Sequence, residues 1–201
     1  MSINVCNNNS MSAITSLPSG VGGGSLNLIS TQTASSSSTI SFTSGIDSTY
    51  KEYIFKFYDI HPATDNVDFQ VNFSSDSGSN YNVTKTTTFF AAYQNESGSA
   101  TALTYADANG LAQSTGFQML NDGVGNGNDE SCVGTLHLFD PSNTTFVKHF
   151  MATSHRHYYL DYAIVDYMAG YCNTTSAIDA VQFKFESGNI DSGTIKLYGV
   201  S

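Results

Sequence analysis

The chain has 201 residues, of which 40% are apolar, 12% are aromatic and only 12% are charged. Its formal net charge is −10, which disfavours binding to nucleic acid or to an anionic membrane surface, because neutralising phosphates requires many Lys and Arg side chains. No apolar run approaches the ~20 residues of a membrane-spanning helix, and the polar first ten residues do not resemble a secretion signal.

The first 24 residues differ in composition from the rest of the chain. Asn7–Asn9 is a polar run, and residues 18–24 combine one proline with several glycines. Such a segment buries too little apolar surface to fold alone. We therefore predict that residues 1–24 form an extended arm that binds a partner, and that residues 25–201 form one domain. The side chains expected to contact the partner are Leu17, Pro18, Val21 and Leu26.

From residue 26 onward, apolar and polar residues alternate in short segments that are separated by turn-forming residues. Phe69, Val71 and Phe73, for example, alternate with Gln70 and Asn72. A period of two places the apolar side chains on one face of a sheet. The strands predicted in the first half of the chain lie at 26–30, 40–42, 53–58, 69–73 and 83–93.

The segment Ser97–Asn109 departs from this pattern because it is rich in alanine and is followed by Gly110. Alanine favours helices and glycine commonly ends them, so we predict a short helix inserted between strands. Further strands are predicted at 117–120, 133–139, 145–153, 158–167, 180–185 and 195–198.

About ten short strands without heptads or a fixed-period repeat predict an all-β fold. We expect a two-sheet antiparallel sandwich of jelly-roll type, with one short helical insertion and the extended N-terminal arm.

The cysteines are few and widely spaced: Cys6, Cys132 and Cys172. An odd number without a CxxC pair indicates reduced thiols in a reducing cytoplasm, and neither a disulfide framework nor a structural zinc site. The sequence also lacks a nucleophile elbow and a phosphate-binding loop. We expect no catalytic residues and no cofactor.

The most enzyme-like pattern is the pair His155 and His157, which point the same way if they lie on one strand. Asp161 and Asp166 follow closely, and His137 is the candidate ligand from another strand. This set suggests a metal-dependent, cupin-like enzyme as an alternative. Because the spacing matches no strong metal motif, we expect surface histidines and no metal site.

The segment Asp122–Glu130 is rich in Asp, Asn and Gly, which suits the oxygen ligands of Ca²⁺. It departs from the EF-hand pattern, since Val124 takes the third position. We predict a solvated hairpin loop.

Tyrosines gather late in the chain, and the three closest together are Tyr158, Tyr159 and Tyr162. Aromatic residues of this kind are typical of subunit contacts. Exposed rings also stack on sugars, although this chain has no tryptophan. Both interpretations, subunit contact and glycan contact, remain open for these three residues.

Four segments carry a resemblance to a known group of proteins: Ser35–Lys51, Tyr53–Asn66, Thr135–His149 and Asn173–Gly199. Together they resemble small structural proteins of marine tailed bacteriophages, including cyanophages. The resemblance covers most of the chain after residue 24 and contains strand and turn sequence without a catalytic motif. It implies a jelly-roll subunit of the virion, on the capsid or the tail, that folds in the host cytoplasm.

The function expected from this resemblance is that of a capsid decoration or cement protein. Such a protein would bind the major capsid or tail protein and neighbouring copies, with a homotrimer favoured. The sequence lacks the heptads and shaft repeats of a long fibre. The alternative is a tail-fibre or receptor-binding component that contacts host-surface glycans. Neither role requires an enzyme activity, a cofactor, nucleic acid or a membrane.

Overall fold

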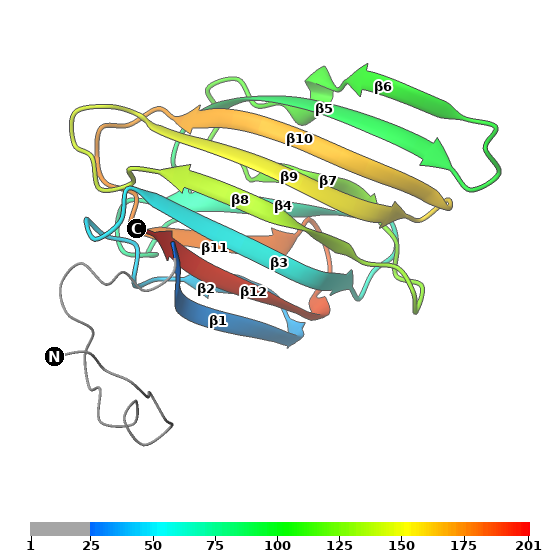
Figure 1. Cartoon of the computed structure of the whole chain (residues 1–201), viewed down its shortest axis with the longest axis horizontal. Helices are drawn as coiled ribbons and strands as arrows, with labels where there is room; N and C mark the ends of the chain where they lie inside the picture. The colour runs from blue at the N-terminus through cyan, green and yellow to red at the C-terminus, as the bar shows by residue number, and fades with distance from the viewer. Residues whose placement is uncertain (1–24) are drawn as a thin grey trace, which may run out of the picture.

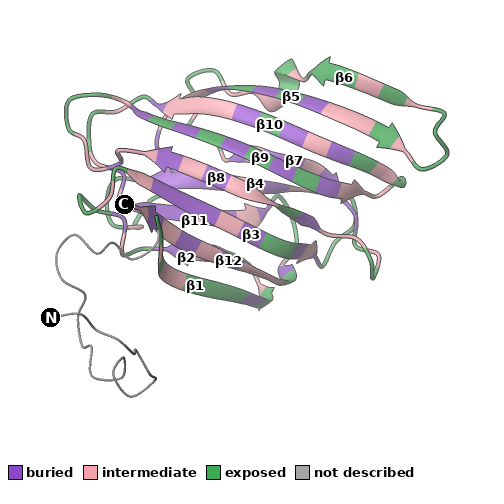
Figure 2. Cartoon of the chain, in the orientation of Figure 1, coloured by how far each residue is buried: buried purple, intermediate pink, exposed green. Residues whose placement is uncertain are grey.

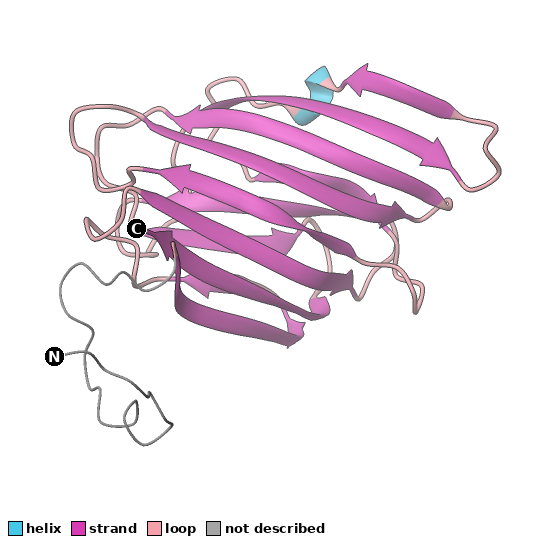
Figure 3. Ribbon diagram, in the orientation of Figure 1, coloured by secondary structure: helices cyan, strands magenta, loops and turns pink. Residues whose placement is uncertain are grey.

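The computed structural model describes residues 25–201. The predicted arm, with Leu17, Pro18 and Val21, lies outside the described residues. The described part consists of β-strands and one three-residue 3-10 helix (Figure 3). The strands are β1 (Leu26–Ser37), β2 (Ile40–Phe42), β3 (Glu52–Pro62), β4 (Val67–Ser74), β5 (Lys85–Asn95), β6 (Thr101–Tyr105), β7 (Gln118–Val124), β8 (Cys132–Phe139), β9 (Lys148–Tyr158), β10 (Tyr162–Cys172), β11 (Ala180–Phe185) and β12 (Ile190–Val200).

The strands form two antiparallel layers (Figure 1). The larger layer has the order β1-β12-β3-β8-β9-β10-β5-β6, and the smaller layer has the order β2-β11-β4-β7. The layers join where Val124 of β7 pairs with Tyr158 of β9. Strands β3 and β4 follow each other in the chain, and so do β11 and β12. In the larger layer β3 pairs with β12, and in the smaller layer β4 pairs with β11. The predicted all-β sandwich of jelly-roll type is therefore confirmed.

Alternating burial along each strand separates an inner face from an outer face (Figure 2). In β9, Phe150, Ala152 and Ser154 are buried, whereas Met151 and Thr153 are exposed. The inner faces of the two layers meet in a core that is rich in phenylalanine. Phe183 of β11 lies at its centre and its ring contacts four others, which are Phe42, Phe55, Phe57 and Phe69.

The predicted helix over Ser97–Asn109 is largely wrong. Residues Thr101–Tyr105 form β6, and only Asp107–Asn109 is helical, as a single 3-10 turn. Alanine is a weak determinant when a neighbouring strand offers a full ladder of hydrogen bonds, and here β5 pairs with every residue of β6. No helix among residues 25–201 is long and apolar enough to span a membrane.

Several strands extend beyond their predicted ends because a neighbouring strand continues to pair with them. β1 runs on to Ser37, where a turn was expected, and β9 reaches Tyr158. Leu26, predicted as an arm contact, begins β1 opposite Val200 and keeps 41% of its surface exposed.

Cys132 and Cys172 are buried and free, as predicted for reduced thiols. Cys172 pairs in register with both Lys85 and Lys148, two buried lysines. Burial raises the pKa of Cys172 to about 12 and lowers the pKa of Lys85 to about 8. The Lys85 amine donates hydrogen bonds to the carbonyls of Val83 and Gly116, which satisfies it within the protein. A buried thiol with a raised pKa is unreactive, so Cys172 is a structural residue.

Candidate functional site: a groove beside β7

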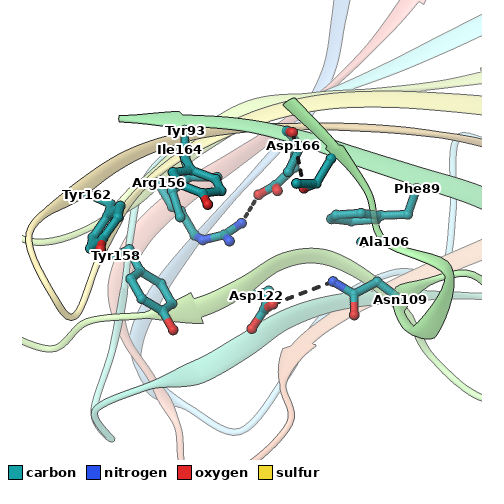
Figure 4. A pocket seen from close by; sticks show the side chains of 12 residues that line it. Phe89, Tyr93, Ala106, Asn109, Asp122, Arg156, Tyr158, Tyr162, Ile164 and Asp166 are labelled. Carbon is teal, nitrogen blue, oxygen red and sulfur yellow. Dashed lines mark hydrogen bonds and ion pairs between the residues drawn. The ribbon is translucent and has the colours of Figure 1, made fainter. Parts of the chain in front are cut away.

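The smaller layer ends at β7, whereas the larger layer continues through β10, β5 and β6. The inner face of these last strands and the edge of β7 enclose a cavity of about 250 Å³ (Figure 4). Ala106 and Asn109, at and beside the 3-10 turn, form part of its lining. We call this cavity the groove. Its volume lies just below the ~300–1,000 Å³ of sites for drug-sized ligands, and its lining combines aromatic rings with a few polar groups, as such sites do.

Aromatic rings line one side of the groove. Tyr93, Tyr158 and Tyr162 come from β5, β9 and β10. The ring centroids of Tyr93 and Tyr162 are 5.7 Å apart, and those of Tyr158 and Tyr162 are 5.9 Å apart, both edge to face. Burial raises the pKa of Tyr158 to about 12, so its phenol stays neutral at physiological pH and can donate or accept a hydrogen bond.

An ion pair between Arg156 and Asp166 forms the floor of the groove. Both side chains are almost completely buried, with 4% and 1% of their surface exposed. Asn121 of β7 donates one hydrogen bond of 2.9 Å to the Asp166 Oδ2 and another of 2.9 Å to the Ser154 Oγ. Burial raises the pKa of Asp166 above its usual value, because desolvation outweighs the opposing charge of Arg156.

Two buried atoms of this pair have no hydrogen-bond partner within the protein. They are the Arg156 Nε and the Asp166 Oδ1. Unsatisfied buried polar atoms are rare in native proteins and each calls for an explanation. Because both atoms are covered by protein, a ligand in the groove would reach them only after the side chains of the pair move.

Asp122 and Asn109 complete the polar lining opposite the ion pair (Figure 4). The Asn109 amide donates a long hydrogen bond of 3.5 Å to the Asp122 Oδ2. Arg156 also lies over the ring of Tyr158, with its guanidinium carbon 5.6 Å from the ring centroid. The groove thus offers ring faces, two carboxylates, a guanidinium and an amide within one small space.

The structure brings some of the predicted site residues together and separates others. Tyr158 and Tyr162 line the groove, whereas Tyr159 is not part of the lining and its ring lies beside that of Tyr158, at a centroid distance of 4.5 Å. The histidines do not form the cupin-like set that was considered as an alternative. His155 and Asp166 lie on opposite faces of the larger layer, because their registers differ by one residue. The Nδ1 of His137 contacts the Glu52 Oε1 at 2.6 Å instead.

The predicted loop Asp122–Glu130 is shorter than expected, since β7 continues to Val124. The Glu130 carboxylate folds back and accepts a hydrogen bond of 2.5 Å from the Gly127 N–H. Its side chain is 12% exposed, so it does not project into solvent like a free calcium ligand.

Sequence reasoning missed Tyr93 and the central role of Arg156. One signal was available: Arg156 is the only arginine in an acidic chain, and it falls at a position of β9 where alternation points inward. An inward arginine requires an acidic partner.

The comparisons with known proteins leave the groove to be interpreted from its own geometry. Searches with protein-family models, curated proteins and solved structures found no match for this chain.

Proposed function

We propose that the chain is a carbohydrate-binding sandwich whose groove holds a small saccharide. One observation carries this proposal. Three tyrosine rings and the polar side chains of Asn109, Asp122 and Arg156 share a cavity of about 250 Å³. Sugars present apolar C–H faces that pack on aromatic rings, and their hydroxyls both donate and accept hydrogen bonds. The lining supplies acceptors in Asp122 and Asp166 and a donor in Arg156.

The charges of the groove favour a neutral saccharide over an acidic one. Two carboxylates, of Asp122 and Asp166, face a single guanidinium from Arg156. The whole chain also carries a formal net charge of −10. An anionic sugar would therefore enter against repulsion that no further cation in the lining offsets.

Replacing Tyr162 with alanine is expected to weaken binding of a neutral oligosaccharide about tenfold, or about 1.4 kcal/mol, since a stacking ring is lost. The ligand would first be identified on an array of neutral and acidic glycans, and its affinity would then be measured by titration calorimetry.

Tyr167→Ala is the matched control for this variant. Tyr167 lies on the same strand but on the outer face, and 38% of its surface is exposed. Its removal should leave affinity unchanged. Equal losses in both variants, or an array without any neutral glycan bound, would refute saccharide binding in the groove.

We also propose that the protein is a virion component of a tailed bacteriophage, as the four resembling segments suggest. Among such roles, a groove for a neutral saccharide favours a receptor-binding component that contacts host-surface glycans. Capsid decoration is the second candidate. It is favoured by a different part of the molecule, on the outer face of the larger layer.

An apolar surface covers β6, β5, β10 and β9 on this outer face. We define the outer apolar patch as Leu103, Tyr105, Phe90, Tyr167 and Met151, which are between 38% and 73% exposed. The rings of Phe90 and Tyr167 stack at 4.9 Å. A patch without any charged member lets two chains of net charge −10 approach without bringing carboxylates together. We propose that a second copy covers it, within an oligomer for which a trimer is favoured.

Replacing Phe90 and Met151 together with lysine is expected to convert the oligomer into monomers, because two charges would be buried without partners. Light scattering coupled to size-exclusion chromatography measures the mass. Phe146→Lys is the control, since Phe146 is 68% exposed outside the patch. A wild-type protein that is monomeric at high concentration would rule out self-association through the patch.

A further inference from the structure

Three acidic or imidazole side chains from separate segments meet at one end of the larger layer. Glu96 follows β5, His157 lies at the end of β9, and Asp161 lies in the turn between β9 and β10. One potential ligand atom from each of the three lies within 4.8 Å of the other two. We propose that Glu96, His157 and Asp161 bind a divalent transition-metal ion such as Zn²⁺.

The surroundings of His157 place its two ring nitrogens in different roles. The Nδ1 lies 3.3 Å from the Glu130 Oε1, and the Nε2 lies 3.6 Å from the Glu96 Oε1. The Nδ1 atom is buried, and although Glu130 is near, it has no hydrogen bond of good geometry. When the proton is on Nδ1, facing the Glu130 carboxylate, the lone pair of Nε2 is free to bind an ion. A carboxylate behind the imidazole is the usual support of a metal-binding histidine.

Backbone and side-chain hydrogen bonds hold the ligand-bearing segments in place. The Glu96 N–H donates a bond of 3.0 Å to the Asp161 carbonyl, which ties the two turns together. The amide of Asn95 donates to the hydroxyls of Ser97 and Ser99, each at 2.9 Å. The site therefore needs only side-chain movement to close on an ion.

The donor set selects the kind of ion. Mg²⁺ and Ca²⁺ prefer sites made entirely of oxygen, whereas an imidazole nitrogen suits Zn²⁺ and its neighbours in the first transition row. Two carboxylates also balance the two charges of the ion. A tetrahedral Zn²⁺ with bonds of ~2.0–2.1 Å holds its ligands ~3.4 Å apart. Glu96 and Asp161 are both exposed, so their side chains can close to that spacing.

This site is separate from the saccharide proposal and does not rest on it. It does share a hairpin with the groove, because Tyr158 and Tyr162 flank the turn that contains Asp161. A bound ion would link that turn to the turn after β5. We therefore expect the ion to raise the stability of this end of the molecule.

Titration of the full chain with ZnCl₂ is expected to show one ion bound per chain by calorimetry, with a rise in melting temperature. His157→Gln should abolish both signals, and Asp161→Asn should weaken binding about tenfold or more. Asn suits position 161, since its φ of 61° is left-handed. Asp161→Asn should not change the melting temperature without metal, because its side chain is exposed.

The control is Asp191→Asn. The Asp191 Oδ2 lies 3.8 Å from the Nδ1 of His61, a histidine–carboxylate pair that is not part of the three-ligand cluster. This variant should bind Zn²⁺ like the wild type, and MgCl₂ should give no heat with either protein. The proposal is overturned if the wild type takes up no ion, or if His157→Gln retains its affinity while Asp191→Asn loses it.

Discussion

Replacing Phe183 with alanine is expected to lower the free energy of unfolding by about 3–5 kcal/mol. The ring is completely buried and stacks on Phe69 at 5.9 Å, with the planes inclined by only 14°. It also contacts Phe55 and Phe57 of the opposite layer. Its removal leaves a cavity between the two layers. The strands cannot move together to fill this cavity without breaking the hydrogen bonds between neighbouring strands. The loss is a large part of the ~5–15 kcal/mol that stabilises a typical domain.

Urea denaturation and calorimetry measure this effect, and the melting temperature should fall by roughly 10 °C. The urea m-value should not change, because the same surface is exposed on unfolding. Phe146→Ala is the control, since that ring is 68% exposed and should cost less than about 0.5 kcal/mol. Equal stabilities of the two alanine variants would contradict the described core.

Replacing Arg156 with methionine is expected to destabilise the protein by about 3–5 kcal/mol at neutral pH. The substitution leaves the Asp166 carboxylate buried at 1% exposure without its cation. Burial already raises the pKa of Asp166 in the wild type, and without Arg156 it rises further. A raised folded-state pKa means that stability is retained below the unfolded value of about 4 and is lost as the pH rises. The defect should therefore be small near pH 4 and large at neutral pH.

The double variant Arg156→Met with Asp166→Leu should recover most or all of the wild-type stability, because two apolar side chains replace a costly buried pair. Asn121 keeps its hydrogen bond to Ser154 in this variant. The double variant should nevertheless fail to bind saccharide, since the polar floor of the groove is gone. This result would separate the contribution of the pair to binding from its contribution to folding.

Denaturation curves of the wild type and both variants at the two pH values supply the measurement. A single variant as stable as the wild type at neutral pH would show that the pair is not buried as described. A double variant as unstable as the single one would show that the destabilisation does not come from the unpaired carboxylate.

Strands in which apolar and polar residues alternate strictly could be predicted from the sequence, because burial of one face produces a pattern of period two within the strand itself. Phe69, Val71 and Phe73 are all completely buried in β4, and Phe183 and Phe185 are buried in β11. Each of these two strands can be recognised from its own residues, which number eight in β4 and six in β11. Free thiols at Cys132 and Cys172 could be predicted from the number and spacing of the cysteines, but their burial was not predicted.

β6 could not be predicted because its state depends on a partner rather than on its own residues. Leu103 and Tyr105 point outward and are 73% and 64% exposed, so no buried face marks the strand. Only the pairing of Phe90 with Tyr105 and of Ala92 with Leu103 shows that β5 holds it in place.

The candidate sites were partly visible in the sequence. Tyr158 and Tyr162 are close along the chain and face each other across a short turn. Asp122 reaches the groove, and Asn121 reaches Asp166 beneath it, only because β7 lies beside β4 and ends at β9. Glu96 likewise meets His157 because β10 lies between β5 and β9 and pairs with both. Contacts that depend on the order of strands leave no local pattern.

The position of β12 between β1 and β3 has a consequence for biosynthesis. β1 is among the earliest described segments to leave the ribosome, yet its partner β12 is the last of the described strands to be made. During translation the nascent chain must carry the apolar inner side of β3 without its neighbour. Such distant pairing is slow to form and exposes intermediates to aggregation. Production should therefore improve at reduced temperature or with added chaperones, which protect the waiting strands until β12 arrives.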